Sequence, residues 1–592
     1  MPTAILTGPP VPGSPLEGEL RSLGFDVRHA PAPWDAGHVL SALPAAERVA
    51  LVDSRFVGHT HALRLALTDP RFEACAIPGA LGVQAPLRAE LTAAAAEPDP
   101  LTANLPDRLA AALESAGTPV QRPELGTLVA EVPQDPGART AAAAAVAAVD
   151  DEAVRLRTAV KSRDGFFTTF FISPYSRYIA RWCARRGLTP NQVTTASLIT
   201  ALIAAGCAAT GERTGYIAAG VLLLVSFVLD CTDGQLARYA LKYSTMGAWL
   251  DATFDRAKEY AFYAGLALGA ARGGDDVWAL ALGSMVLMTC RHVVDFSFNE
   301  ANHDATANTS PTAALSGKLD SVGWTVWIRR MIILPIGERW AMIAVLTAAT
   351  TPRITFYALL IGCAFGALYT TAGRVLRSLT RKAKRTDRAA QALADLADTG
   401  PLGELVARLT ARPAHPLRLL FALVGAVVVT GAAWTEPFGS PTVVYAALLY
   451  AVLAGNAVSQ PLKGALDWLL PPLFRAAEYG TVLLLAAKAD VPGALPAAFG
   501  LVAAVAYHHY DTVYRIRGGT GAPPHWLVRT TGGHEGRVLI TTALAAVLAR
   551  NTDFPVALTA LAVFVALVVL AESIRFWVSS GAPAVHDEGE PA

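Results

Sequence analysis

The chain has 592 residues, of which 53% are hydrophobic and only 16% are charged. This composition excludes a soluble globular protein of this size and is typical of a polytopic membrane protein with a soluble part. A formal net charge of +1 gives no support for a nucleic-acid partner. The six cysteines have no C-x-x-C spacing, which argues against a zinc site or a disulfide framework.

The N-terminal quarter has a soluble character. Short apolar runs, such as Ala4–Leu6 and Val49–Val52, alternate with helical stretches over residues 1–150. We expect an α/β domain in the cytoplasm, because the N-terminus lacks the basic and apolar regions of a cleaved signal peptide. Residues 151–187 then predict a linker and a helix in the membrane interface, where aromatic side chains stand beside the arginines of the segment 177–186.

Six apolar segments follow, and their composition predicts membrane-spanning helices. They lie near residues 190–210, 214–236, 246–270, 277–298, 338–350 and 354–375. Basic clusters precede the first segment and follow the sixth. An even number of spans places both clusters on one side, as the positive-inside rule requires. We therefore expect a six-span membrane domain over residues 188–378, with both ends in the cytoplasm.

A charged linker, residues 379–415, separates this domain from a second helical membrane region over residues 416–580, and residues 581–592 are expected to form a disordered tail. The candidate spans of the second region lie near residues 417–434, 441–460, 472–489, 494–510, 536–550 and 555–577. The chain is thus predicted to be mainly α-helical, a polytopic bundle in two parts behind an α/β domain.

The second membrane region contains some of the residue types of the first at similar spacing. The residues Arg256, Glu259 and Tyr260 recur as Arg475, Glu478 and Tyr479, and the pair His292 and Asp295 recurs as His508 and Asp511. Two interpretations stay open: a degenerate repeat of the second half of the first membrane domain, or an unrelated helical bundle of scaffolding type. Under both interpretations we expect this region to be non-catalytic.

The most informative stretch is DCTDGQLARYALKYSTMGAWLDATFD, residues 230–255, with the spacing D-x2-D-G-x2-A-R-x8-G-x3-D-x3-D. Carboxylates inside a membrane domain are costly and indicate a functional site. Positions three or four apart share a helix face, so Asp230 pairs with Asp233 and Asp251 with Asp255 at the cytoplasmic ends of two adjacent spans. An ion or proton path could also use paired aspartates, but it has no need of the glycines and the arginine.

Facing carboxylate pairs suit hard divalent cations, which prefer oxygen ligands. Two such ions can bridge a pyrophosphate, and a carboxylate not wholly committed to metal can take the proton of an incoming hydroxyl. Gly234 would let a nucleotide approach the helix backbone, and Arg238 can pair with a phosphate. Ala237 and Gly247 would keep the two helices close.

The motif matches, at every fixed position, the signature of the CDP-alcohol phosphotransferase family. This resemblance implies transfer of a phospho-alcohol from a CDP-alcohol to a second alcohol, with release of CMP. It also implies Mg²⁺ or Mn²⁺, two ions in all, held by Asp230, Asp233 and Asp251, with Asp255 as the general base that also contacts the second metal.

The resemblance also implies a set of nucleotide-binding positions. They are Asn191, Thr194, Gly234, Ala237, Arg238, Ser244 and Gly247. Asn191 and Thr194 come from LTPNQVT, residues 188–194, which resembles the family element that precedes the motif. This segment could instead cap the first span, since Thr189-Pro190 suits a helix start, and nucleotide binding and capping are compatible.

The segment DATFDR, residues 251–256, is similar to the phosphatidylinositol-phosphate synthases of actinobacteria, whereas the layout resembles the bifunctional inositol-phosphate cytidylyltransferase and di-inositol-phosphate-phosphate synthase. The N-terminal domain departs from that pattern, because the loop LTGPPVPGS (residues 6–14) carries no basic residue for a triphosphate. We expect a degenerate nucleotidyltransferase, inactive or regulatory. An active cytidylyltransferase is the alternative.

The resemblance implies a CDP-alcohol donor, CDP-diacylglycerol or CDP-inositol, and an alcohol acceptor such as an inositol phosphate. Arg256 and Arg291 are candidates to bind the acceptor phosphate, whereas Arg329 and Arg330 fit ordinary flanking charges. We expect a multi-pass protein of the cell membrane, in contact with lipid, with the active site facing the cytoplasm. A homodimer is an open alternative, as is a catalytically silent lipid-binding scaffold.

Overall fold

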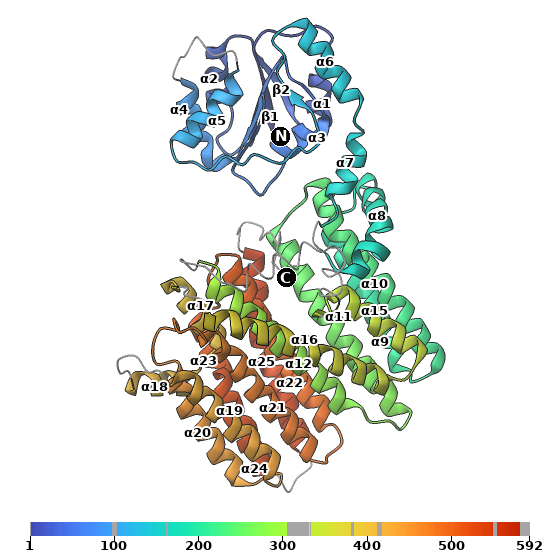
Figure 1. The fold of residues 1–592 in the computed structure, drawn as a ribbon, viewed down its shortest axis with the longest axis vertical. Coiled ribbons are helices and arrows are strands. Elements are labelled where there is room, and N and C mark those ends of the chain that lie inside the picture. Colours follow the sequence, from blue (N-terminus) through green and yellow to red (C-terminus); the bar gives the residue numbers. More distant parts are fainter. Residues whose placement is uncertain are drawn as a thin grey trace. The chain divides into compact units, whose positions relative to one another are not determined.

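The computed structural model describes residues 2–96, 104–161, 164–304, 331, 333–380, 384–410, 417–548 and 553–579 (Figure 1). The chain divides into two compact units, each described below by itself. The first comprises Met1–Ser162, Ser173–Pro190 and Thr232–Ser244, and the second comprises Arg163–Ile172, Asn191–Cys231 and Thr245–Ala592. The tail expected over residues 581–592 lies outside the described residues.

The N-terminal domain is built on a five-stranded sheet, which confirms the predicted α/β class. The strand order is β2 (Asp26–Ala30), β1 (Thr3–Thr7), β3 (Val49–Asp53), β6 (Ala80–Val83) and β5 (Ala74–Ile77). Strand β1 runs parallel to both β2 and β3, whereas β6 is antiparallel to β3 and to β5. A separate pair, β4 (Val57–Gly58) and β7 (Ala130–Glu131), is antiparallel.

Alternating side chains of the sheet fill two hydrophobic cores, one on each face. Leu6 and Val52 pack with α1 (Leu16–Ser22) and α3 (Thr60–Leu67), whereas Ile5 and Leu51 pack on the other face. The second core is completed by α2 (Pro33–Ala42), α4 (Arg88–Ala96) and α5 (Leu105–Ser115). Helices α6 (Pro136–Ala147) and α7 (Asp151–Thr158) follow.

A helical turn at Thr168–Ile172 leads into α8 (Ser173–Arg185). This segment exposes a set of large aromatic side chains, namely Phe170, Phe171, Tyr175, Tyr178 and Trp182. Guanidinium groups lie over two of these rings, since Arg181 covers Tyr178 and Arg186 covers Trp182. Exposed aromatics beside arginines are what a helix in the headgroup region of a bilayer requires.

All six spans predicted for the first membrane domain are helices. They are α9 (Pro190–Ala209), α10 (Arg213–Ala240), α11 (Thr245–Arg272), α12 (Trp278–Asn302), α15 (Ile336–Ala349) and α16 (Pro352–Thr380). Glycines bring two of them together: a Cβ at Gly265 or Gly269 of α11 would collide with the carbonyl oxygens of Ala205 and Ala208 on α9. Small residues are the usual means of close helix packing in membranes.

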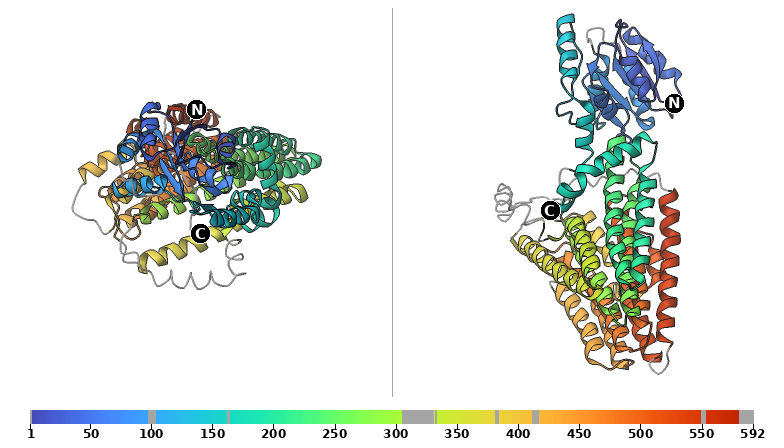
Figure 2. Two further views of the ribbon diagram at one scale, coloured as in Figure 1. Left: turned by 90° about the horizontal axis from the view of Figure 1, so that it is seen from above. Right: turned by 90° about the vertical axis from the view of Figure 1, so that its right-hand side faces the viewer.

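The second membrane region also has its six predicted helices. They are α19 (Arg418–Thr435), α20 (Pro441–Ala457), α21 (Leu470–Lys488), α22 (Ala494–Arg517), α24 (Gly533–Leu548) and α25 (Phe554–Ser579). Two shorter helices precede them, α17 (Asp387–Ala397) and α18 (Pro401–Leu409), and a third, α23 (His525–Thr531), lies between α22 and α24. The long helices of this bundle run alongside one another in the right-hand view of Figure 2.

Within the described residues, seven helices are long and apolar enough to cross a membrane. They are α9, α10, α12, α16, α19, α25 and the segment Asp467–Lys488 that includes α21. The other predicted spans form helices that are shorter or more polar; α15, α20 and α24 have 14, 17 and 16 residues. The helices and their apolarity confirm the predicted fold class, and the chain is a multi-pass membrane protein.

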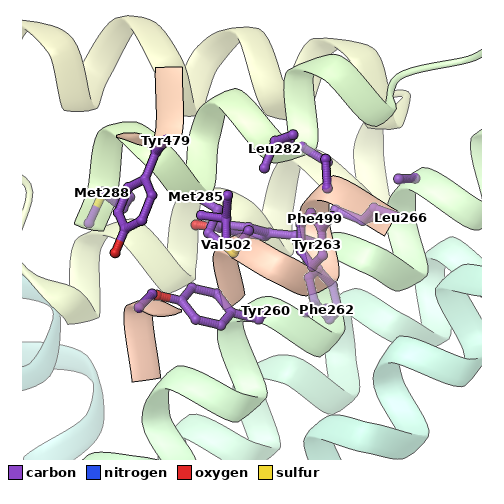
Figure 3. Packing of buried hydrophobic residues seen from close by; sticks show 14 of the residues in the cluster. Tyr260, Phe262, Tyr263, Leu266, Leu282, Met285, Met288, Tyr479, Phe499 and Val502 are labelled. Atoms are coloured by element: carbon purple, nitrogen blue, oxygen red, sulfur yellow. The ribbon is translucent and has the colours of Figure 1, made fainter. Parts of the chain in front are cut away.

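The two membrane regions share one continuous hydrophobic core. Figure 3 shows Tyr260 and Tyr263 of α11 and Met285 of α12 close to Tyr479 and Val502, which come from α21 and α22. Helices from both halves of the bundle therefore enclose the same apolar interior, so the second region is packed as part of one body with the first.

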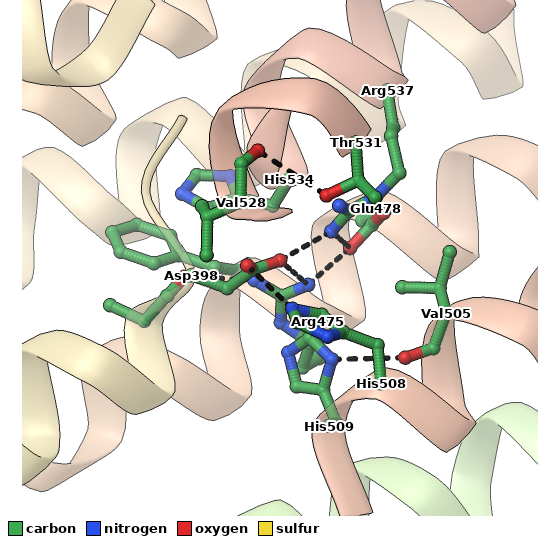
Figure 4. A network of polar contacts seen from close by, with 12 residues as sticks. Asp398, Arg475, Glu478, Val505, His508, His509, Val528, Thr531, His534 and Arg537 are labelled. Atoms are coloured by element: carbon green, nitrogen blue, oxygen red, sulfur yellow. Dashed lines mark hydrogen bonds and ion pairs between the residues drawn. The ribbon is translucent and has the colours of Figure 1, made fainter. Parts of the chain in front are cut away.

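A network of buried charges lies inside the second region (Figure 4). Glu478 accepts from Arg475 (Nη1–Oε2, 2.5 Å) and from Arg537 (Nε–Oε1, 2.5 Å). Asp398 accepts from Arg537 (Nη2–Oδ2, 2.6 Å) and contacts His508 Nε2 at 3.1 Å. All five residues are buried. Each carboxylate thus has a cation within hydrogen-bonding distance, which a charge inside an apolar bundle requires.

Removing one charge of this network should destabilise the protein strongly. Asp398→Asn keeps a side chain that tolerates the left-handed backbone (φ 53°) but leaves Arg537 without one of its two carboxylates. We expect the free energy of unfolding to fall by about 3–5 kcal/mol, measured by reversible unfolding in mixed micelles. Asp387→Asn is the control, because that side chain is 93% exposed. Equal stability of the two variants would contradict this account.

Candidate active site

The carboxylates of the motif come from the end of α10 and the beginning of α11. Asp230 and Asp233 lie one helical turn apart on α10, whereas Asp251 lies on α11. Each of the three offers an oxygen atom that lies within 4.8 Å of the other two. Asp233 is buried and Asp251 is exposed, so the group is open on one side. A cluster made only of carboxylate oxygens fits a hard divalent cation.

Asp255 is not part of that group of three and is instead held by Lys258. The Nζ atom of Lys258 lies 2.8 Å from Asp255 Oδ1 and also forms an ion pair with Asp230 Oδ1. It donates as well to Ser197 Oγ, at 3.2 Å. The lysine side chain is fully buried, so its ammonium group is a fixed positive charge between the two carboxylates.

The sequence prediction did not include Lys258. One sequence feature could have indicated Lys258: it lies one helical turn after Asp255, in a predicted span that is apolar toward its end. A charged residue at such a position needs a partner of opposite charge. That its partners are Asp255 and Asp230 depends on how α10 and α11 pack, which the spacing alone does not give.

Arg238 lies over the glycine of the motif. A Cβ at Gly234 would be 3.5 Å from both Nη atoms of Arg238, which is an ordinary contact distance, so the guanidinium group lies directly beside the glycine. The Nε atom of Arg238 donates to the carbonyl oxygen of Ala159, at 2.6 Å. Residues that follow α7 therefore fix the orientation of this arginine.

The turn that joins the two aspartate-bearing helices is held by the same unit. Arg155 of α7 donates from Nε to the carbonyl oxygen of Tyr239 (2.7 Å), and its guanidinium lies 3.6 Å from the centre of the Tyr239 ring. Arg71 lies 4.1 Å from the ring centre of Tyr243, and burial raises the pKa of the Tyr243 hydroxyl. Leu241 takes a left-handed conformation (φ 51°) in this turn. No local sequence pattern predicts these long-range contacts.

The other predicted nucleotide-binding positions lie near the ends of three helices. Asn191 and Thr194 are in the first turn of α9, which begins at Pro190, and Thr194 is buried. Ala237 is half-buried on α10. Ser244 is exposed just before α11, and Gly247 is in its first turn.

The two candidate acceptor arginines have different surroundings. Arg256 forms an ion pair with Glu259 through one of its nitrogen atoms (Nη1–Oε2, 2.8 Å), and Glu259 also binds Arg339 (Nε–Oε1, 3.2 Å). Arg291 is 6% exposed and donates from Nη2 to the carbonyl oxygen of Ile333. Among the described residues, its Nε and Nη1 atoms form no hydrogen bond.

Three further arginines, at positions 329, 330 and 374, flank the later spans in the sequence. Arg374 forms an ion pair with Asp295 and so has an internal partner. The pair at positions 329 and 330 lies outside the described residues.

Two family models match the membrane part of the chain. Residues 187–365 match CDP-alcohol phosphatidyltransferase, and residues 387–592 match a family of unknown function (DUF5941). The segment 187–365 includes the whole aspartate motif and the helices that carry it. The first membrane domain is therefore similar to the CDP-alcohol phosphatidyltransferase family, which confirms the resemblance found in the sequence.

Named relatives agree with this assignment. The chain is 28% identical over 203 residues to the bifunctional IPC transferase and DIPP synthase of Aquifex aeolicus, over 34% of this chain and 45% of the relative. It is 34% identical over 113 residues to the archaetidylinositol phosphate synthase of Pyrococcus horikoshii (19% and 58%) and 34% identical over 131 residues to the phosphatidylinositol phosphate synthase of Streptomyces avermitilis (21% and 51%). The chain thus spans about half the length of each relative.

Lys258 should be required for stability when no divalent ion is bound. Lys258→Met removes the only cation that the described structure places between Asp230 and Asp255, so the free energy of unfolding should fall by about 3–5 kcal/mol in a chelator. Mn²⁺ should then raise the unfolding temperature more than it does in the unmodified protein. Lys242→Met, at an exposed position in the turn, is the control. Identical melting of both variants would contradict this role.

Proposed function

We propose that the chain is an integral-membrane CDP-alcohol phosphotransferase that needs a divalent metal ion. The observation that carries the proposal is the convergence of Asp230, Asp233 and Asp251 within 4.8 Å, inside the segment that matches the family. A lipid-binding scaffold would have no need of carboxylates gathered in this way, because like charges at this distance repel one another and lower stability.

Each residue of the candidate site is assigned a separate role in the reaction. Asp230, Asp233 and Asp251 would hold Mg²⁺ or Mn²⁺, and a bound ion would neutralise the pyrophosphate of the donor. Two ions are expected, with Asp255 contributing to the second. Arg238 would bind a nucleotide phosphate beside Gly234, where the absence of a side chain lets the substrate approach the helix.

Asp255 would act as the general base. Its carboxylate takes the proton of the acceptor hydroxyl while the hydroxyl oxygen bonds to the phosphorus that carries the donor alcohol. The bond between that phosphorus and the bridging oxygen breaks, and CMP leaves with the electron pair. Lys258 Nζ, 2.8 Å from Asp255 Oδ1, keeps this carboxylate oriented and ionised before the acceptor arrives.

CDP-diacylglycerol is the donor that we propose, with CDP-inositol as the second choice, and an inositol phosphate is the proposed acceptor. Two relatives, the archaetidylinositol phosphate synthase and the phosphatidylinositol phosphate synthase, have names that refer to inositol lipids, which supports this choice. Arg291 supports a phosphorylated acceptor, because two of its nitrogen atoms lack hydrogen bonds among the described residues.

We place the catalytic aspartates and the N-terminal domain at the cytoplasmic face. The support is the pair of basic clusters around an even number of spans. In sealed vesicles of known orientation, an added protease should remove the N-terminal domain only when the cytoplasmic face is outside. Cleavage in the opposite vesicles would overturn this orientation.

The N-terminal domain is proposed to be a nucleotidyltransferase fold without its original activity. Its loop over residues 8–14 has no basic side chain, and it is closed by Ser54, whose Oγ donates to the carbonyl oxygen of Pro9 at 2.7 Å. Asp53 is bound by Arg55 (Nη2–Oδ2, 2.8 Å). Incubation of the full chain with CTP and an inositol phosphate should therefore release no pyrophosphate.

Replacement of the base should abolish transfer. Asp255→Asn retains the size of the side chain but cannot take a proton, so kcat should fall by about 100-fold or more. The assay measures CMP released from CDP-diacylglycerol in the presence of Mg²⁺ and an inositol phosphate. Asp276→Asn, in an exposed turn, should keep full activity. Normal turnover by Asp255→Asn would exclude the assigned role.

Arg155 should affect nucleotide binding from outside the membrane domain. Arg155→Ala removes the contacts with Tyr239 that hold the α10–α11 turn, so the KM for the CDP-alcohol should rise about ten-fold with kcat changed less than about two-fold. Arg157→Ala, exposed on the same helix, is the control, and Arg155→Lys should restore part of the loss. A lower kcat at constant KM would refute this positioning role.

A further inference from the structure

The second membrane region repeats the sequence around the catalytic base of the first. WLDATFDRAKEY (residues 249–260) and WLLPPLFRAAEY (residues 468–479) are identical at six of twelve positions, as Trp, Leu, Arg, Ala, Glu and Tyr. The offset of 219 residues is constant through both segments. The first segment lies near the beginning of α11, and the second includes the beginning of α21. The repeat is therefore on the third long helix of each half.

The repeated residues make the same contacts. Glu259 accepts from Arg256 three positions earlier (2.8 Å), and Glu478 accepts from Arg475 three positions earlier (2.5 Å). A second arginine then reaches each glutamate from the fifth long helix. Arg339 of α15 lies 3.2 Å from Glu259, and Arg537 of α24 lies 2.5 Å from Glu478. An arginine–glutamate–arginine arrangement is thus built twice from corresponding helices.

A second pair of contacts is also repeated. Glu338, at the beginning of α15, accepts from the backbone N–H of Phe167 (3.3 Å) and lies against Gly165. Glu535, at the beginning of α24, accepts from the backbone N–H of Gly403 (2.9 Å) and lies against this glycine. In each half, the carboxylate holds the segment that precedes the first long helix.

We infer that the C-terminal domain is a second, metal-free copy of the transferase fold, which packs on the first copy as its partner and positions Arg256 and His292 through Tyr510. This inference extends the proposed function, since it assigns an origin and a role to the domain that matches a family of unknown function. Among the described residues, six helices of 14 or more residues follow one another in each half.

The residues that would hold metal are the ones that the second copy lacks. At the offset of 219 residues, the positions equivalent to Asp251, Asp255 and Lys258 are occupied by Leu470, Phe474 and Ala477. Helix α20, which corresponds to α10, has no acidic residue. The charges that stabilise the bundle are kept, whereas the charges that serve catalysis are gone, as expected when only the fold is needed.

The two copies contact each other in a reciprocal way. Helix α12 packs against α21 and α22, and α22 packs against α11 and α12, so corresponding helices of the two halves meet each other. This is the pattern of an isologous interface between two identical subunits. A homodimer of the whole chain would therefore have to use another face.

Tyr510 of α22 crosses this interface. The Arg256 guanidinium lies 5.2 Å from the centre of its ring, and its hydroxyl forms a hydrogen bond with His292 Nδ1. Arg256 follows Asp255 directly and is a candidate for the acceptor phosphate. The second copy thus contributes a side chain that fixes two residues beside the catalytic base, and Tyr510 is a positioning residue.

Kinetics of Tyr510 variants in the full chain test this role, with CDP-diacylglycerol, Mg²⁺ and an inositol phosphate as substrates and metal. Tyr510→Phe should raise the KM for the inositol phosphate about five-fold with kcat within about two-fold, and Tyr510→Leu should raise it about ten-fold or more. Tyr450→Phe is the matched control, because its hydroxyl binds His534 (2.7 Å) inside the second copy. It should leave both constants unchanged.

Unaltered kinetics of both Tyr510 variants, in a protein that is active, would overturn the positioning role. Absence of turnover in the unmodified protein would instead count against the proposed function. Mn²⁺ binding then tests the metal-free second copy without any activity: in electron paramagnetic resonance, the variant in which Asp230, Asp233, Asp251 and Asp255 are all replaced by Asn should lose all tightly bound Mn²⁺. Residual tight binding would show a metal site in the second copy and refute the inference.

Discussion

Compensation of buried charge is the constraint on which this bundle depends. An ion in an apolar interior is tolerated only with a partner of opposite charge at hydrogen-bonding distance. Glu259 meets this requirement between Arg256 and Arg339, and Glu478 meets it between Arg475 and Arg537. Each arrangement connects two helices that are far apart in the sequence, so the charges fix which helices are neighbours.

The candidate active site follows the same rule with one difference. Four aspartates lie on α10 and α11, and the buried Lys258 lies between two of them, Asp230 and Asp255. Asp230, Asp233 and Asp251 bring carboxylate oxygens within 4.8 Å of one another, and Asp251 is exposed. Clustered carboxylate oxygens attract divalent cations, and those cations attract phosphates. Structure and chemistry therefore depend on the same set of charges.

Much of the fold could be predicted from the sequence, because hydropathy reports directly on helices in a bilayer. All twelve predicted spans are helices, and the motif placed the aspartates on α10 and α11 before their packing was known. Lys258, Arg155 and Tyr510 could not be assigned in this way. Their roles depend on contacts between segments separated by 28 residues or more, as for Lys258 with Asp230, and no local pattern encodes such contacts.

The similar spacing of the repeated residues in the second region was also visible in the sequence, but it did not show whether the region is a repeat or an unrelated bundle. An Arg-x-x-Glu-Tyr segment alone fits an unrelated bundle equally well. The corresponding second arginines, Arg339 and Arg537, come from helices whose equivalence only the packing reveals. The structure therefore favours a repeat, and the domains on either side of the site both contribute side chains that orient it.

The most direct test is mass spectrometry of the lipids formed by the full-length protein in liposomes with CDP-diacylglycerol, an inositol phosphate and Mg²⁺. Our account predicts one new lipid whose mass is that of the acceptor joined to the phosphatidyl group, together with CMP, and no product when the metal is chelated. If no metal-dependent product forms from CDP-diacylglycerol or from any other CDP-alcohol, the account of this site as a phosphotransferase is wrong.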